Sequence, residues 1–91
     1  MELRWTSKAL SDLTRLHEFL AAANKPAAAR AVRTLTAAAG TLVSNPRIGE
    51  RLDEFEPREI RRVQVGRYEE CYEIAQATIY VLRLWHTRED R

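Results

Sequence analysis

The spacing of apolar residues changes once along this chain, and that change limits the folds open to it. Between residues 7 and 43 apolar side chains recur every three to four positions, as on one face of an α-helix. After residue 57 they alternate every second position, as in a half-buried β-strand. A chain of 91 residues builds one hydrophobic core, which both halves must share. The sequence therefore predicts one α+β domain over residues 1–91.

The first half predicts a short strand and a helical hairpin. Polar and apolar residues alternate over residues 2–6, and Thr6 and Ser7 then offer N-caps for a helix. The apolar stripe of that helix, with Asp12 mostly outside it, consists of Leu10, Leu13, Leu16 and Leu20. Residues 24–26 interrupt the helix at a proline, which suits the first turn of a second helix. We expect the second helix to end near residues 44–46.

The second half predicts three strands after a loop over residues 45–57. Gly66 and Arg67 join the first two strands, because a leading glycine suits a type II′ hairpin turn. A weaker turn near residues 76–77 joins the second and third. The expected order is β-α-α-β-β-β, with the helix hairpin packed on one face of a small, mainly antiparallel sheet. The edge that takes the opening strand is left open.

The last strand is apolar on both faces, which bears on function. Tyr80, Leu82 and Leu84 alternate with neighbours that are also mostly apolar. Two helices cover only one side of a sheet, so we expect an exposed apolar face on the other side that includes Ile79, Val81 and Trp85. A small protein rarely exposes such a face without a partner for it.

Composition excludes several functional classes. The net charge is only +2, from 15 basic and 13 acidic residues, which is too balanced for a dedicated nucleic-acid binder. The three glycines are too far apart for a phosphate-binding loop. His17, His86 and Cys71 lack metal-ligand spacing, so we expect no metal and no cofactor. The absence of a signal-peptide pattern and of a long apolar run predicts a cytoplasmic protein without membrane contact.

Two basic segments each allow two interpretations. Residues 58–68 carry four arginines, which either bind phosphates or carboxylates of a target or are neutralised on the strand by Glu69, Glu70 and Glu73. The tail over residues 85–91 combines a tryptophan, a histidine and two arginines. It is either a recognition or acid–base site or a polar chain end.

Motifs along the whole chain resemble the RelE/ParE-type toxins of bacterial toxin–antitoxin systems. The segment V-L-R-L-W-H-T-R-E-D-R at 81–91 is similar to the family's closing strand. Four further matches follow in the family's order, namely W-T-S-K-A-L-S-D-L at 5–13, which carries A-x-x-D-L, N-P-R-I-G at 45–49, I-R at 60–61, and V-G-R-Y at 65–68 with Y-E-I at 72–74. Glu73 departs from the pattern, since the family usually has arginine there.

The resemblance implies a growth-arresting toxin of the kind that stabilises plasmids, without a cofactor, neutralised by a cognate antitoxin protein. That antitoxin would wrap the helices and the sheet. The contacts expected for it are Leu16, Leu20, Val81 and Trp85.

Family members of this type divide by target. ParE-like members poison DNA gyrase, whereas RelE-like members cut mRNA on the ribosome. In the RelE-like case the catalytic residues implied here are Arg61, Arg67, Arg83 and His86, with Glu50 as a counterpart of the acidic base. The lysines and the tail tyrosine of that branch are absent, and a charge of +2 suits docking on ribosomal RNA poorly. The resemblance therefore favours DNA gyrase.

The expected contacts to the target gather in the closing segment 83–91, supported by two arginines of the preceding strands. They are Arg61, Arg67, Arg83, Trp85, His86 and Arg88. A small DNA-binding domain that uses Arg30 and Arg33, or a non-toxic protein-interaction module, remains as a further alternative.

Overall fold

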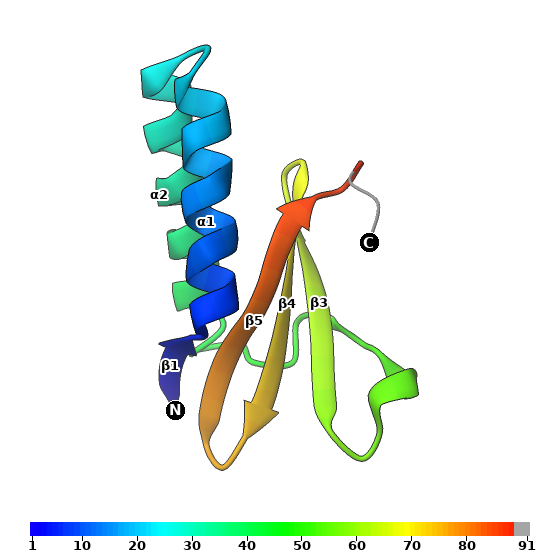
Figure 1. The fold of residues 1–91 in the computed structure, drawn as a ribbon. Helices are drawn as coiled ribbons and strands as arrows, with labels where there is room; N and C mark the ends of the chain where they lie inside the picture. Colours follow the sequence, from blue (N-terminus) through cyan, green and yellow to red (C-terminus); the bar gives the residue numbers. More distant parts are fainter. Residues whose placement is uncertain (89–91) are drawn as a thin grey trace.

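The computed structural model describes residues 1–88 and confirms the predicted α+β class (Figure 1). Two helices lie side by side against one sheet. The elements in chain order are β1 (Glu2–Trp5), α1 (Ser7–Ala21), α2 (Lys25–Thr41), β2 (Glu50–Arg51), the short 3-10 helix η1 (Asp53–Phe55), β3 (Glu59–Val65), β4 (Tyr68–Ala75) and β5 (Thr78–His86). The stretch predicted as a plain loop over 45–57 thus contains a two-residue strand and a helical turn.

The sheet runs in the order β1-β5-β4-β3-β2. The opening strand lies parallel to β5 at one edge, which settles the question that the sequence left open. All other neighbours are antiparallel. Since β1 pairs only with residues 78–81, the rest of that edge of β5 is left to α1.

Local capping explains where the helices begin and end. Thr6 accepts a hydrogen bond from the Ala9 N–H, and Asn24 accepts one from Ala27 at the start of α2. The α2 helix ends at Thr41, a few residues before the predicted end. Its last turn tightens because the Leu42 N–H reaches the carbonyls of Ala39 and Gly40, three and two residues back.

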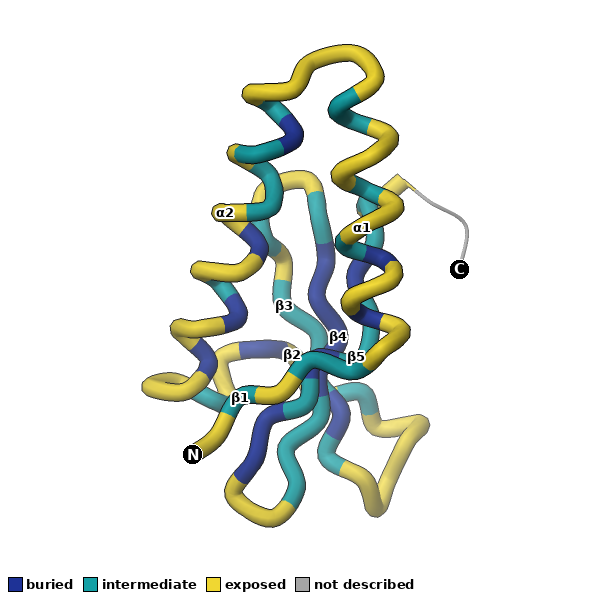
Figure 2. The backbone as a smooth tube through the Cα atoms, turned by 60° about the vertical axis from the view of Figure 1, so that its left-hand side comes forward, coloured by how far each residue is buried: buried dark blue, intermediate teal, exposed yellow. Residues whose placement is uncertain are grey.

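The core lies between the helices and the sheet, where buried residues follow α2 and β4 (Figure 2). Val81 packs with Ala9 and Ala39, and Ile79 packs with Leu42 and Tyr72. Both Ile79 and Val81 are fully buried. The predicted exposure of these two residues on the outer face is therefore wrong, because they point toward the helices.

A bulge in β5 explains part of the difference between the predicted and the observed orientation of its side chains. Tyr72 of β4 pairs with Val81, but the adjacent Cys71 pairs with Arg83, so Leu82 is an extra residue in its strand. Past this bulge the alternation of side chains shifts by one position. Leu84 then faces the helices as Val81 does, and strict alternation from the sequence misses that shift.

A buried tyrosine holds the loop before β2. The Tyr72 hydroxyl donates to the Pro46 carbonyl over 2.7 Å and accepts from the Gly49 N–H over 3.0 Å. Arg61 donates to the Gly49 carbonyl over 2.7 Å. A Cβ atom at Gly49 would lie 2.6 Å from the Arg62 carbonyl oxygen, so the close approach requires glycine. The loop motif 45–49 therefore has a structural role in this fold.

Candidate functional site

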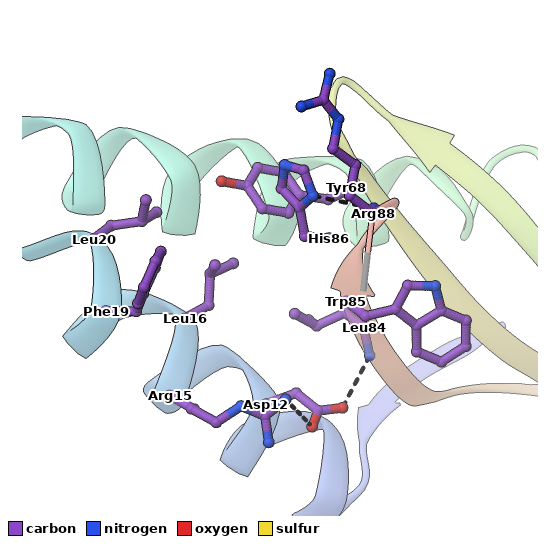
Figure 3. A pocket seen from close by; sticks show the side chains of 10 residues that line it. All are labelled: Asp12, Arg15, Leu16, Phe19, Leu20, Tyr68, Leu84, Trp85, His86 and Arg88. Atoms are coloured by element: carbon purple, nitrogen blue, oxygen red, sulfur yellow. Dashed lines mark hydrogen bonds and ion pairs between the residues drawn. The ribbon is translucent and has the colours of Figure 1, made fainter. Parts of the chain in front are cut away.

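An open groove runs between α1 on one side and the start of β4 and the end of β5 on the other (Figure 3). Its volume is about 480 Å³. The residues around it are mostly apolar with a few charged groups, namely Asp12, Arg15, Leu16, Phe19, Leu20, Tyr68, Leu84, Trp85, His86 and Arg88. This region, called the α1–β5 groove below, is the candidate site.

The helix side of the α1–β5 groove exposes a large apolar surface. Leu16, Phe19 and Leu20 follow one another at helical spacing past the region where α1 packs on the core. The Phe19 side chain is 76% exposed. A phenyl group exposed to that extent beside two leucines is typical of a contact surface for another protein.

The base of the α1–β5 groove is fixed by Asp12. Its carboxylate accepts hydrogen bonds from Arg83 over 2.7 and 3.1 Å, from the Leu84 N–H over 3.1 Å and from Arg15 over 3.3 Å. Burial of this group acts to raise its pKa, but the bonds from Arg83 and Leu84 outweigh burial and hold the pKa of Asp12 below its ordinary value. Asp12 is therefore ionised at neutral pH and ties α1 to the edge of β5.

The strand side of the groove is built by the end of β5. Leu84 and Trp85 point to opposite sides of that strand, and Leu84 faces α1 (Figure 3). The His86 ring meets the Tyr68 ring edge-on, with 5.4 Å between their centroids. Beyond the strand, Thr87 donates its N–H to the Arg67 carbonyl over 2.9 Å. These contacts hold the chain in place up to the described end of the tail.

The arginines of β3 and the segment before it are paired with carboxylates outside the α1–β5 groove. Glu59 binds Arg47 and Arg61, each with a shortest contact of 2.9 Å. Two further pairs join neighbouring strands or segments, Arg58 with Glu73 and Arg62 with Glu50. The contact to Arg58 is the main reason that the pKa of Glu73 lies below its ordinary value.

A family model described as "ParE toxin of type II toxin-antitoxin system, parDE" matches residues 3–91 of the chain. The chain belongs to the ParE toxin family. Among solved structures it is similar to the chain titled "Chromosomal ParDE TA system from P. aeruginosa", with a TM-score of 0.78 and 23% sequence identity. That match covers 94% of this chain and 95% of the other, and it supports the same fold. No curated protein matches the chain.

In this ParE-family fold, five residues predicted for target or antitoxin contact lie around the same groove. They are Leu16, Leu20, Trp85, His86 and Arg88. Arg83 joins them through Asp12. The predicted antitoxin contact Val81 lies in the core, and this surface therefore does not include it. Residues 89–91 of the predicted target segment lie outside the described residues.

Two of the predicted arginines lie away from the α1–β5 groove. Arg67 is in the turn between β3 and β4, where its carbonyl holds Thr87. In the sheet register Arg61 lies opposite Tyr72, and His86 lies opposite Tyr68. Arg61 and His86 are therefore four residues of β4 apart along the sheet. At about 3.3 Å per residue this is roughly 13 Å along the strand.

Two acidic residues have positions in the structure that the sequence did not indicate. Asp12 was placed outside the apolar stripe but is 3% exposed and central to the α1–β5 contact, while Leu10 of the stripe is half exposed. The A-x-x-D-L motif, which includes Ala9 and Asp12, was the available signal for it. One interpretation of the arginine-rich segment has Glu70 neutralise arginines, but Glu70 is fully buried, and neither of its oxygens has a hydrogen-bond partner among residues 1–88. No feature of the sequence pointed to that burial.

Within residues 1–88, no three His, Cys, Asp or Glu side chains are grouped as metal ligands would be. Neither helix in this part of the chain is long and apolar enough to cross a membrane.

Proposed function

We propose that this ParE-family toxin inhibits DNA gyrase in the cytoplasm by trapping the cleaved-DNA state, and so arrests growth. A cognate antitoxin neutralises it by covering the α1–β5 groove. The observation that carries this proposal is the state of the residues that an RNA-cleaving relative would use. Arg61 and Arg83 are each engaged in the fold by a carboxylate of their own, and they lie on different strands with β4 between them.

Cleavage of RNA needs charged groups that converge on one phosphate and are available to it. The Arg61 side chain is 14% exposed and is bound to Glu59 and to the Gly49 carbonyl. Arg83 donates two hydrogen bonds to Asp12. Glu50, the candidate acidic base, is paired with Arg62. These contacts favour structural roles and support a toxin that acts by binding.

The closing segment fits a binding role. Its side chains follow directly from β5, and the contacts of His86 with Tyr68 and of Thr87 with Arg67 keep it against the sheet. A preordered segment of this kind loses little conformational entropy when it docks. Because His86 and Arg88 also line the groove, an antitoxin bound there masks them. Neutralisation then follows from competition for one surface.

The test is an incubation of the chain with gyrase, supercoiled plasmid and ATP, followed by detergent and protease treatment and a gel. We expect linear DNA with the full chain and none with a chain that lacks residues 86–91. The variant Arg30→Ala, changed on the exposed face of α2, serves as the matched control and should retain activity. Circular dichroism should be the same for the truncated chain, and this chain should still bind the antitoxin through Leu16, Phe19 and Leu20 of α1. Full activity of the truncated chain would contradict the assignment of this segment.

One observation keeps the mRNA-cleaving alternative in the test. Arg67 and His86 lie at the same end of the sheet, joined through Tyr68 and Thr87. If gyrase is unaffected at excess toxin, ribosomes programmed with a defined mRNA should be assayed for cleavage in the A site. Cleavage that depends on Arg67 and His86 would replace the gyrase proposal. An expressed chain that leaves growth unchanged would instead favour a non-toxic interaction module.

A further inference from the structure

A carboxyl group lies inside the core of this fold without a partner. Glu70 is the third residue of β4 and lies opposite Val63 on one side and Leu84 on the other. Its residue is 0% exposed, and neither carboxyl oxygen has a hydrogen-bond partner in the part of the chain that the structure describes. An isolated ionised carboxylate in such a place is strongly destabilising, and the group takes up a proton to avoid it.

The position of Glu70 couples it to the α1–β5 groove. Leu84, its partner across the strands, lines the groove, and so does Tyr68, two residues away on the same face of β4. The groove therefore lies beside Glu70, and separation of α1 from β5 gives water a route to this carboxyl. Asp12 fixes the contact of α1 with β5, because its carboxylate accepts a hydrogen bond from the Leu84 N–H.

Other charged or titratable groups on the helix-facing side are held by partners of their own. Asp12 of α1 is bound to Arg83 and Arg15, and His86 of β5 meets Tyr68 of β4. On β3, Arg61 is bound to Glu59, and on β4 the Tyr72 hydroxyl is bound to the loop before β2. The charged residues of α2 are exposed, namely Lys25, Arg30 and Arg33.

We propose that Glu70 makes the packing of the helical hairpin on the sheet sensitive to pH: the protonated carboxyl permits the closed contact of α1 with β5, and ionisation favours an opened state in which water reaches the carboxyl through the groove. Burial alone raises the pKa of Glu70 from its ordinary value to about 7, which places the change near neutral pH. The proposal concerns the fold alone and stands whether or not gyrase is the target.

The sign of the effect follows from proton binding. The closed state keeps the proton up to about pH 7, whereas an opened state releases it near its ordinary pKa of 4.5. Rising pH between these values therefore favours opening. The difference between these two pKa values corresponds to an increase on the order of 100-fold in the opening equilibrium as the pH rises.

The direct test is the titration of the Glu70 carboxyl carbon by NMR in the unmodified chain, together with hydrogen exchange of the Leu84 amide at about pH 5 and pH 8, corrected for intrinsic exchange. We expect a midpoint near 7 and an opening equilibrium that rises by on the order of 100-fold. A midpoint near the ordinary glutamate value, or an opening equilibrium that does not change with pH, would overturn the proposal.

Variants separate Glu70 from other titrating groups. Glu70→Gln keeps both histidines, so a pH dependence that persists in this variant would belong to them and would overturn the proposal. We expect its Leu84 exchange to be independent of pH after correction. Glu73→Gln, changed on the same strand at a residue paired with Arg58, should keep the full pH dependence. If Glu70→Gln does not fold, the titration of the unmodified chain still decides the question.

Discussion

Asp12 and Arg83 are 71 positions apart in sequence and form a two-bond ion pair, with Arg83 donating over 2.7 and 3.1 Å. The same carboxylate accepts the Leu84 N–H at the part of the β5 edge that β1 does not cover. One side chain of α1 thus replaces a missing strand partner. This arrangement sets the distance between α1 and β5, and with it the width of the α1–β5 groove.

Replacing Asp12 by Ala should destabilise the fold by about 2–4 kcal/mol, because it leaves the Leu84 N–H and Arg83 without their acceptor. The measurement is chemical denaturation at neutral pH. Arg15→Gln is the matched control, because Arg15 contacts the same carboxylate but its side chain is 60% exposed. That control should change stability by less than about 0.5 kcal/mol. Equal losses in both variants would contradict the role given to Asp12.

The stability of the chain should have a maximum between about pH 4.5 and 5. Asp12, Glu59 and Glu73 have lowered pKa values in the folded state, so the stability that they contribute is lost as the pH falls below their ordinary values. Glu70 has a raised pKa of about 7, so its protonated form contributes stability that is lost as the pH rises from 4.5 to 7. The loss on this alkaline side is on the order of 3 kcal/mol.

Urea denaturation at a series of pH values measures this profile. In Glu70→Gln the loss between about pH 5 and 7 should disappear, while the loss in acid should remain. A profile of the unmodified chain that is flat from weakly acidic to neutral pH would show that the folded protein ionises Glu70 without cost.

Changes in the apolar part of the groove should weaken antitoxin binding without unfolding the toxin. Phe19→Asp and Leu20→Asp place a charge on the exposed stretch of α1. We expect each to reduce affinity at least about tenfold, measured by calorimetry, because a charge is desolvated at an apolar contact. Leu10→Asp, at a half-exposed position of α1 away from the groove, is the control. A loss of affinity in Leu10→Asp alone would place the antitoxin elsewhere on the helix.

The sequence predicted the order of the elements because each period is a local property. Residues 7–21 and 25–41 form the expected hairpin, and the turn at Gly66 has φ +59 as expected for a leading glycine. The strand order required long-range information, since the parallel pairing of β1 with β5 joins the two halves of the chain. No local pattern encodes which edge a distant strand joins.

In the candidate site, too, the features that depend on tertiary packing could not be predicted from the sequence. The family resemblance implied Leu16 and Leu20 as antitoxin contacts, and they line the groove. Val81 was misplaced because its orientation depends on how β5 packs against the helices. Glu70 was misplaced for a related reason, since a charged residue alternating on a strand gives no sign of which face the helices cover.

Gly49→Ala should destabilise the fold by about 2–3 kcal/mol, because its Cβ would meet the Arg62 carbonyl and the Tyr72 hydroxyl at 2.6 and 2.7 Å. Backbone atoms of β3 cannot move aside without disturbing the sheet. Gly40→Ala is the matched control in α2, where an added Cβ meets nothing within 4 Å. That substitution should leave stability unchanged or raise it by up to about 1 kcal/mol. Thermal denaturation of the two variants measures the contrast.

The hairpin between β4 and β5 turns through two residues with positive φ, Gln76 at 51° and Ala77 at 59°. Side chains with a Cβ atom are strained there by about 1–2 kcal/mol each. Replacing the pair by Asn and Gly, which favour this turn, should stabilise the chain by about 1 kcal/mol in urea denaturation. The reverse substitution in the hairpin between β3 and β4 is the control. Gly66→Ala, at φ +59, should lower the free energy of unfolding by about 1 kcal/mol. An added Cβ there meets no described atom within 4 Å, so only the backbone conformation opposes it. A Gln76→Asn, Ala77→Gly variant that is less stable than the original would show that the Cβ contacts of this turn outweigh its backbone strain.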